Sequence, residues 1–170
     1  MQRLVMLSVA LWALLILSPF AFSQSFAEKA QKDRAVDMSD EDPAMQKAME
    51  RARAGLEDFL RKAGSPPPNT DQYSVKVRVS EGDNQEYLWV SNLQSRGDIW
   101  SGRIDNLPML RSVKKGQSYS FAKTEIVDWT YLDRSKKKIV GNFTTCALLT
   151  KEPPGVAESI QKQYGLECDR

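Results

Sequence analysis

Two acidic residues stand where a carboxylate could act on a substrate. Glu86 precedes Tyr87 and Trp89, and Asp128 immediately precedes Trp129. Two carboxylates beside aromatic rings could form a glycosidase-like site, in which one serves as acid and the other as base or nucleophile. Nothing in the sequence fixes their separation, and such acids commonly accept backbone hydrogen bonds near strand ends. We therefore interpret both as structural acceptors, predict no catalytic residue, and keep a carboxylate-dependent hydrolase as an alternative.

Several other chemistries are excluded by composition. The 170 residues contain no histidine, so His-dependent triads, His–Cys pairs and His-ligated zinc are absent. The two cysteines are too few for a Cys-only zinc site, and no glycine-rich phosphate loop occurs. Ser-x-x-Lys matches at Ser112, Ser120 and Ser135 fall in predicted loops and strands, without the partner motifs of acyl enzymes. We predict neither a cofactor nor a metal site.

A helix is predicted to open the domain. Asp42 is a favourable N-cap and Pro43 suits the first helical position. Apolar residues then recur every three or four positions, and Gly64 with the following Ser-Pro-Pro-Pro stops the pattern. The resulting stripe consists of Met45, Met49, Ala52, Leu56, Phe59, Leu60 and Ala63.

Strands are predicted to follow this helix. From Tyr73 the apolar residues alternate with polar ones, which is typical of a half-buried strand. The predicted strands cover residues 73–80, 86–91, 99–104, 117–122, 127–132 and 138–149, and a short helix ends at Gly165. The order helix, strands, helix predicts an α+β fold. We expect an amphipathic N-terminal helix on a curved antiparallel sheet of about five to six strands, with the domain at 42–166 and a tail at 167–170.

The first 23 residues are typical of a secretory signal peptide. An apolar run follows Arg3, Pro19 breaks it, and Ala21-Phe22-Ser23 is a small-x-small cleavage pattern. The alternative is an uncleaved inner-membrane anchor at residues 4–22. Residues 24–41 are polar and are expected to form a flexible leader. The chain is therefore predicted to be periplasmic or secreted.

An exported chain with two cysteines can form a disulfide. We predict a Cys146–Cys168 bond because the compartment allows it. The alternative is a buried Cys146 thiol with Cys168 free in the tail. Asn142-Phe143-Thr144 is a glycosylation sequon by letter, but it falls inside a predicted strand and is discounted.

Four ordered segments resemble a known bacterial family. They cover residues 86–90, 102–108, 126–131 and 141–144, and they are similar to successive signatures of the YegJ-like domain of unknown function. The resemblance extends from about Pro43 to Leu149. It departs from the family pattern at Tyr87, where a His is common, and at Thr130 and Gln117. It implies a small α+β domain, often exported or attached to other modules, with no established activity, substrate or catalytic residue.

The segment around Asn106 is rich in turn residues. Gly102, Asn106 and Pro108 suit a turn, and we expect Asp128 to cap it as a structural acceptor. In each aromatic segment the rings share a face, so at least one such face should pack on the helix stripe. If the rings are exposed instead, the candidate binding residues are Glu86, Trp89, Asn106, Asp128, Trp129 and Tyr131.

The function that these features favour is binding rather than catalysis. We expect a non-enzymatic interaction module of the cell envelope, with an inhibitor or immunity-type protein as a further alternative. Near-neutral total charge argues against nucleic acid as a partner. Residues 103–138 nevertheless carry nine basic residues against four acidic ones, so the partner could be a protein or an anionic envelope component. Membrane contact is expected only through an uncleaved N-terminal segment.

Overall fold

The computed structural model describes residues 39–168, so the predicted signal peptide and most of the predicted leader lie outside it. Helix α2 (Pro43–Gly64) begins where the sequence predicts. The Asp42 carboxylate accepts a hydrogen bond from the Ala44 amide at 2.9 Å, and Pro43 occupies the first turn. Six of the seven predicted stripe residues lie on the buried side of α2, and Ala63 is only half-buried. The buried side consists of Met45, Ala48, Met49, Ala52, Leu56, Phe59 and Leu60.

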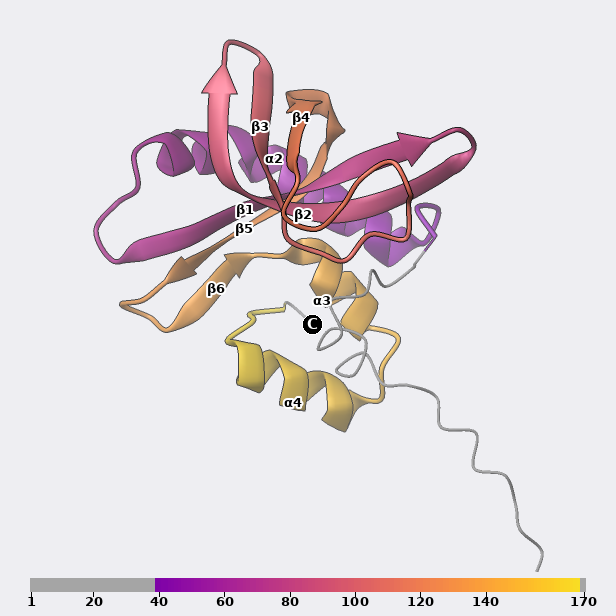
Figure 1. Ribbon diagram of the computed structural model, residues 1–170. Helices are drawn as coiled ribbons and strands as arrows, with labels where there is room; N and C mark the ends of the chain where they lie inside the picture. The colour runs from indigo at the N-terminus through magenta and orange to yellow at the C-terminus, as the bar shows by residue number, and fades with distance from the viewer. Residues whose placement is uncertain (1–38, 169–170) are drawn as a thin grey trace, which may run out of the picture.

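Six strands form one antiparallel sheet, which confirms the predicted α+β class (Figure 1). They are β1 (Thr70–Glu81), β2 (Asn84–Arg96), β3 (Ile99–Ile104), β4 (Ser118–Ala122), β5 (Ile126–Asp133) and β6 (Lys138–Gly141). A short 3-10 turn, η1 (Lys123–Glu125), connects β4 to β5. Their spatial order is β4-β3-β2-β1-β5-β6, so β1 lies in the interior of the sheet between β2 and β5.

The two faces of the sheet have different neighbours. Cross-strand partners share a face, and Val75 pairs with both Val90 and Trp129 on the face that packs on α2. Lys76 pairs with both Trp89 and Asp128 on the opposite face. A second apolar cluster joins the start of α2 to helices α3 (Phe143–Leu149) and α4 (Pro154–Tyr164).

The strand predicted at 138–149 is wrong beyond Gly141. Gly141 and Asn142 both have positive φ, at 84° and 59°, and this reverses the chain out of the sheet. The next residues form α3 instead, so the sequon begins at a strand–helix junction and not inside a strand. Within residues 39–168, no helix combines the length and apolar character needed to cross a membrane.

Candidate functional site

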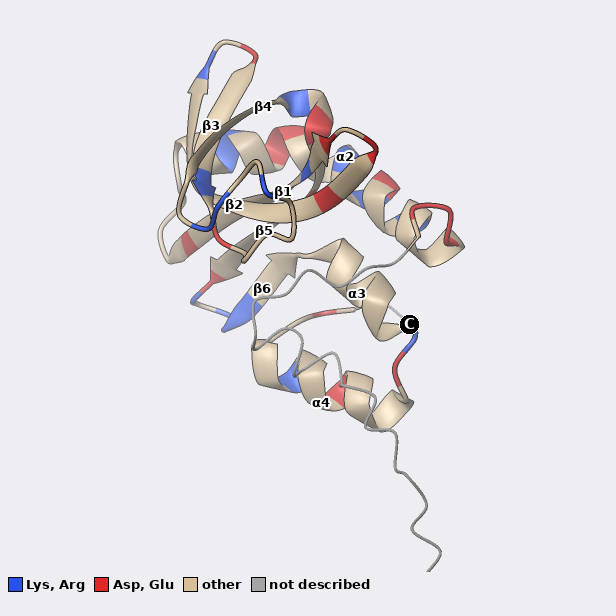
Figure 2. Cartoon of the chain, turned by 45° about the vertical axis from the view of Figure 1, so that its right-hand side comes forward, with Lys and Arg blue, Asp and Glu red and all other residues tan. Residues whose placement is uncertain are grey.

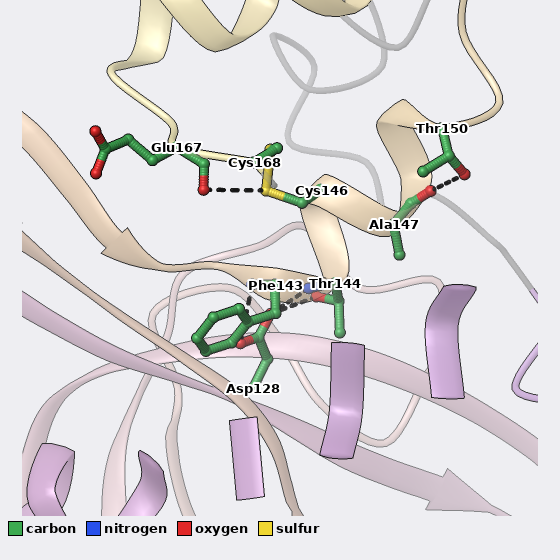
Figure 3. The surroundings of a disulfide bond; sticks show 8 residues. All are labelled: Asp128, Phe143, Thr144, Cys146, Ala147, Thr150, Glu167 and Cys168. Atoms are coloured by element: carbon green, nitrogen blue, oxygen red, sulfur yellow. Dashed lines mark hydrogen bonds between the residues drawn. A yellow bond between two sulfur atoms is a disulfide. The ribbon is translucent and has the colours of Figure 1, made fainter. Parts of the chain in front are cut away.

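Asp128 is fully buried in β5 and accepts four hydrogen bonds, of which Figure 3 shows those from Phe143 and Thr144. One oxygen accepts the amide of Thr144 at 2.7 Å and its hydroxyl at 2.6 Å. The other accepts the amides of Trp129 at 2.8 Å and Phe143 at 3.3 Å. The amides of Phe143 and Thr144 open α3, where helical geometry leaves N–H groups without partners and favours a negative charge.

This arrangement confirms that Asp128 is a structural acceptor, but the capped element differs from the expected one. The carboxylate caps α3, whose residues the sequence pattern assigned to a strand, and not the turn at residues 102–108. The predicted turn has its own acceptor. The Asn106 side-chain oxygen accepts the Trp89 amide at 2.5 Å, which fixes the chain after β3 against β2.

Lys76 completes a chain of three side chains around this cap. Its ammonium donates to the Thr144 hydroxyl at 2.7 Å, and that hydroxyl donates to Asp128. Burial lowers the pKa of Lys76, and the nearby negative charge of Asp128 opposes this shift. Burial raises the pKa of Asp128, and the charge of Lys76 and the hydrogen bonds to the carboxylate oppose that shift. An amine, a hydroxyl and a carboxylate in line could activate a nucleophile. The Thr144 side chain is only 1% exposed, however, so this chain stabilises the fold.

Glu86 is a second buried acceptor, and it tethers the loop between β3 and β4. Its carboxylate accepts the Met109 amide at 2.9 Å and the Leu110 amide at 3.2 Å. Glu86 pairs with Val79 on the face under α2, whereas Asp128 pairs with Lys76 on the opposite face. The structure therefore does not bring the two acids together, and the carboxylate pair required for glycoside hydrolysis is not formed.

The aromatic residues also divide between the two faces. Trp129 stacks on Phe59 of α2 with ring centroids 5.0 Å apart, and Tyr131 stacks on Tyr73 at 5.1 Å. The expectation that one aromatic face packs on the helix stripe is thus confirmed. Trp89 lies on the other face, half-buried, with the Lys76 ammonium 4.8 Å from its ring centroid.

Tyr87 anchors the chain before α2 on this second face. Its hydroxyl donates to Asp40, and Gln85 donates to the same carboxylate at 3.3 Å. Burial, assisted by Asp40, raises the pKa of Tyr87 to about 12.

The six candidate binding residues are divided between the two faces of the sheet and the loop after β3, so they do not form one surface. The residues that sequence reasoning missed are Lys76, which looked like an ordinary polar position in a strand, and Thr144, whose segment was assigned to a strand.

The predicted disulfide is confirmed: Cys146 of α3 is bonded to Cys168, which follows α4 (Figure 3). The same end of the chain also adds to the edge of the sheet. The Ile139 amide donates to the Gly165 carbonyl at 2.9 Å, and Leu166 forms a parallel bridge with Ile139. The disulfide and this bridge hold the chain after α4 against α3 and β6.

Removing the disulfide should lower the free energy of unfolding by about 3 kcal/mol, because a covalent loop of this size restricts the unfolded chain. We expect this loss in urea denaturation of the Cys146→Ala/Cys168→Ala variant. Wild-type protein under reducing conditions should unfold at the same urea concentration as the variant. Two titratable thiols in unfolded, unreduced wild-type protein would contradict the bond.

A basic groove lies between the tip of the β5–β6 hairpin and α4. Figure 2 shows basic residues on both β6 and α4. The groove is open to solvent and has a volume of about 340 Å³. Its lining consists of Lys136, Lys137, Lys138, Glu158, Gln161, Lys162, Gly165, Leu166 and Glu167, and we call it the lysine groove. Within residues 39–168, no three His, Cys, Asp or Glu side chains gather closely enough to hold a metal ion.

Comparison with known proteins matches the chain to a family. A family model described as an uncharacterized protein conserved in bacteria, DUF2314, matches residues 42–168. No curated protein and no solved structure matches the chain.

Proposed function

The chain belongs to the DUF2314 family of uncharacterized bacterial proteins, and from that premise we propose that it is an exported, non-enzymatic binding module of the cell envelope. The observation that supports this proposal is that the polar candidate side chains form hydrogen bonds within the fold itself. Glu86, Asn106 and Asp128 all direct their oxygens at backbone amides of their own chain. The lysine groove, in contrast, is open to solvent and lined by charged groups.

Two features support export. The disulfide is the kind of bond that persists in oxidising compartments such as the periplasm. The N-terminal sequence has the layout of a signal peptide, so the mature chain would begin near Gln24. The proposed location is therefore periplasmic or secreted, with an inner-membrane anchor at residues 4–22 as the alternative.

The closer relationship to the YegJ-like domain is also a proposal. It is supported by where the resembling segments lie. Residues 86–90 are in β2, residues 102–108 form the end of β3 and its turn, and residues 126–131 are in β5. Residues 141–144 carry the junction into α3 that Asp128 caps. The four signatures thus coincide with the strands and with the hydrogen-bonded joints that fix them.

The proposed partner is a protein or an anionic component of the envelope, and not nucleic acid. The test is to incubate the purified chain with envelope extract and to identify what it retains by mass spectrometry. A component that is retained and released with unchanged mass is the expected result. If the component is instead converted to a product, and Glu86→Gln or Asp128→Asn abolishes the conversion, the protein is a hydrolase and the proposal is wrong.

Intact-mass analysis of the protein from the envelope tests the location. We expect an N-terminus at or near Gln24 and a mass that includes the disulfide. Full-length chain recovered from the membrane fraction would replace the signal peptide with an anchor.

A further inference from the structure

We propose that the lysine groove binds phosphate groups of a soluble polar ligand. This inference rests on the proposed binding function and adds a site and a ligand class to it. A volume of about 340 Å³ lies within the usual size of small-molecule sites, which begin near 300 Å³. The residues of one wall come from the β5–β6 hairpin, and those of the other come from the second half of α4 and the chain after it.

The walls of the groove are held at a fixed separation. Gly165 has φ of +66°, and a Cβ atom there would lie 2.8 Å from the Lys137 carbonyl oxygen. This close approach allows the Ile139 amide to reach the Gly165 carbonyl, and the buried Leu166 side chain anchors the next residue. The disulfide at Cys168 then fixes the end of this segment. A groove with fixed walls loses little conformational entropy when it binds a ligand.

The lining carries more basic than acidic residues. Four lysines face two glutamates. Lys138 pairs with Glu167, and Lys136 lies 3.6 Å from Asp133. Lys137 and Lys162 are exposed, and no ion pair is formed by either within residues 39–168. Two ammonium groups, one from each wall, are therefore available to an anion.

The type of the basic residues indicates the class of anion. Arginine binds planar carboxylates through a rigid fork, and the groove lining contains no arginine. Lysine acts as a compact point charge with three donors, and it is a common ligand for phosphate. Leu166, the apolar residue of the lining, is buried, so the ammonium groups are the main feature by which the lining can select a ligand. The ligand is therefore a polar molecule or chain that carries phosphate groups.

The test is calorimetric titration of the full chain with tripolyphosphate as the soluble probe. The variant Lys137→Gln/Lys162→Gln should bind about tenfold more weakly, which corresponds to two exposed ion pairs. The matched control is Lys47→Gln/Lys114→Gln, which removes the same charge from exposed lysines on α2 and on the loop before β4. Its affinity should stay close to that of the wild type, and both variants should keep the wild-type melting temperature because all four side chains are exposed.

Four results would overturn the proposal. The first is the absence of tripolyphosphate binding by the wild-type chain. The second is an equal loss of affinity in both variants, which would indicate general charge attraction. The third is binding to phosphatidylglycerol vesicles without binding to tripolyphosphate, which would indicate a membrane surface. If the groove variant still retains the same envelope component as the wild type, the groove inference fails while the proposed binding function stands.

Discussion

Replacing Trp129 with alanine should lower the free energy of unfolding by about 3 to 5 kcal/mol, the usual cost of truncating a buried tryptophan. Trp129 is only 8% exposed and joins the sheet to both neighbouring helices. Its ring stacks on Phe59 of α2 and meets the Phe143 ring edge-on at a centroid distance of 5.3 Å. Its indole N–H donates to the Ala52 carbonyl at 2.8 Å, so truncation also removes a buried hydrogen bond.

Two glycines make room for this indole, which limits how the site can collapse around a smaller residue. A Cβ atom at Gly55 would lie 2.7 Å from the Trp129 ring, and one at Gly141 would lie 2.6 Å from it. The backbone of α2 therefore rests directly on the ring. Removal of the ring leaves a cavity against main chain that has no side chain to fill it.

Urea denaturation of Trp129→Ala checks this expectation, with Trp89→Ala as the matched control. Trp89 is half-buried on the opposite face and does not pack on α2, so its truncation should cost clearly less. Trp129→Phe should fall between wild type and Trp129→Ala, because it keeps the stacking and loses the indole donor. A Trp129→Ala variant that unfolds at the wild-type urea concentration would show that the ring does not hold the helix to the sheet.

The second large effect is expected for Asp128→Ala, at about 3 to 5 kcal/mol. The substitution leaves the Lys76 ammonium beside the buried Thr144 hydroxyl without its carboxylate. It also leaves the first amides of α3 without an acceptor. Thr144 is only 1% exposed, so its amide and hydroxyl are not easily satisfied in another way.

The measurement is again the free energy of unfolding, supported by two further variants. Thr144→Val keeps the carboxylate and removes only the bridging hydroxyl, so it should cost less than Asp128→Ala. Lys76→Met combined with Asp128→Ala should recover part of the loss, because no buried charge then remains unpaired. If the double variant is as unstable as the sum of the two single variants, Lys76 and Asp128 act independently and the proposed coupling is wrong.

The parts of the fold that the sequence predicts correctly are those with local signals. The start of α2 depends on Asp42 and Pro43, which are adjacent in sequence to the helix they begin. The first strand depends on the alternation from Tyr73 onward, and its apolar positions Val75, Val77 and Val79 are all buried. The predicted strand at 99–104 has the same bounds as β3.

The failure at α3 has a physical cause. The segment Phe143–Leu149 contains two threonines and a phenylalanine, residue types that favour strands, and it has no polar N-cap side chain bonded to its first turn. Its acceptor is Asp128, which lies on β5 and outside the helical segment. A tertiary contact thus overrides the local preference, and no pattern within the segment signals it.

The sequence predicts which residues of the candidate site stand out, but it does not predict which groups they contact. Asp128 and Glu86 stand out because an acid among apolar neighbours must either accept hydrogen bonds or contact a ligand. Which face each acid lies on depends on the strand register, including the irregularity between Lys76 and Val77 against β5. The lysine groove needs residues of the β5–β6 hairpin and of α4 to meet, and the sequence alone does not place those two elements together.

The position of β1 between β2 and β5 has a consequence for the order in which the domain forms. The β1–β2 hairpin, β3 and β4 are consecutive in the chain and can pair as soon as they exist. The other edge of β1 pairs with β5, for example through Lys76 and Asp128, and β5 follows the whole β1–β4 segment in the chain. Closing that long loop is slow, and until it closes the unpaired edge of β1 is a template for intermolecular strand pairing. We therefore expect the chain to be most prone to intermolecular strand pairing before β5 has paired with β1.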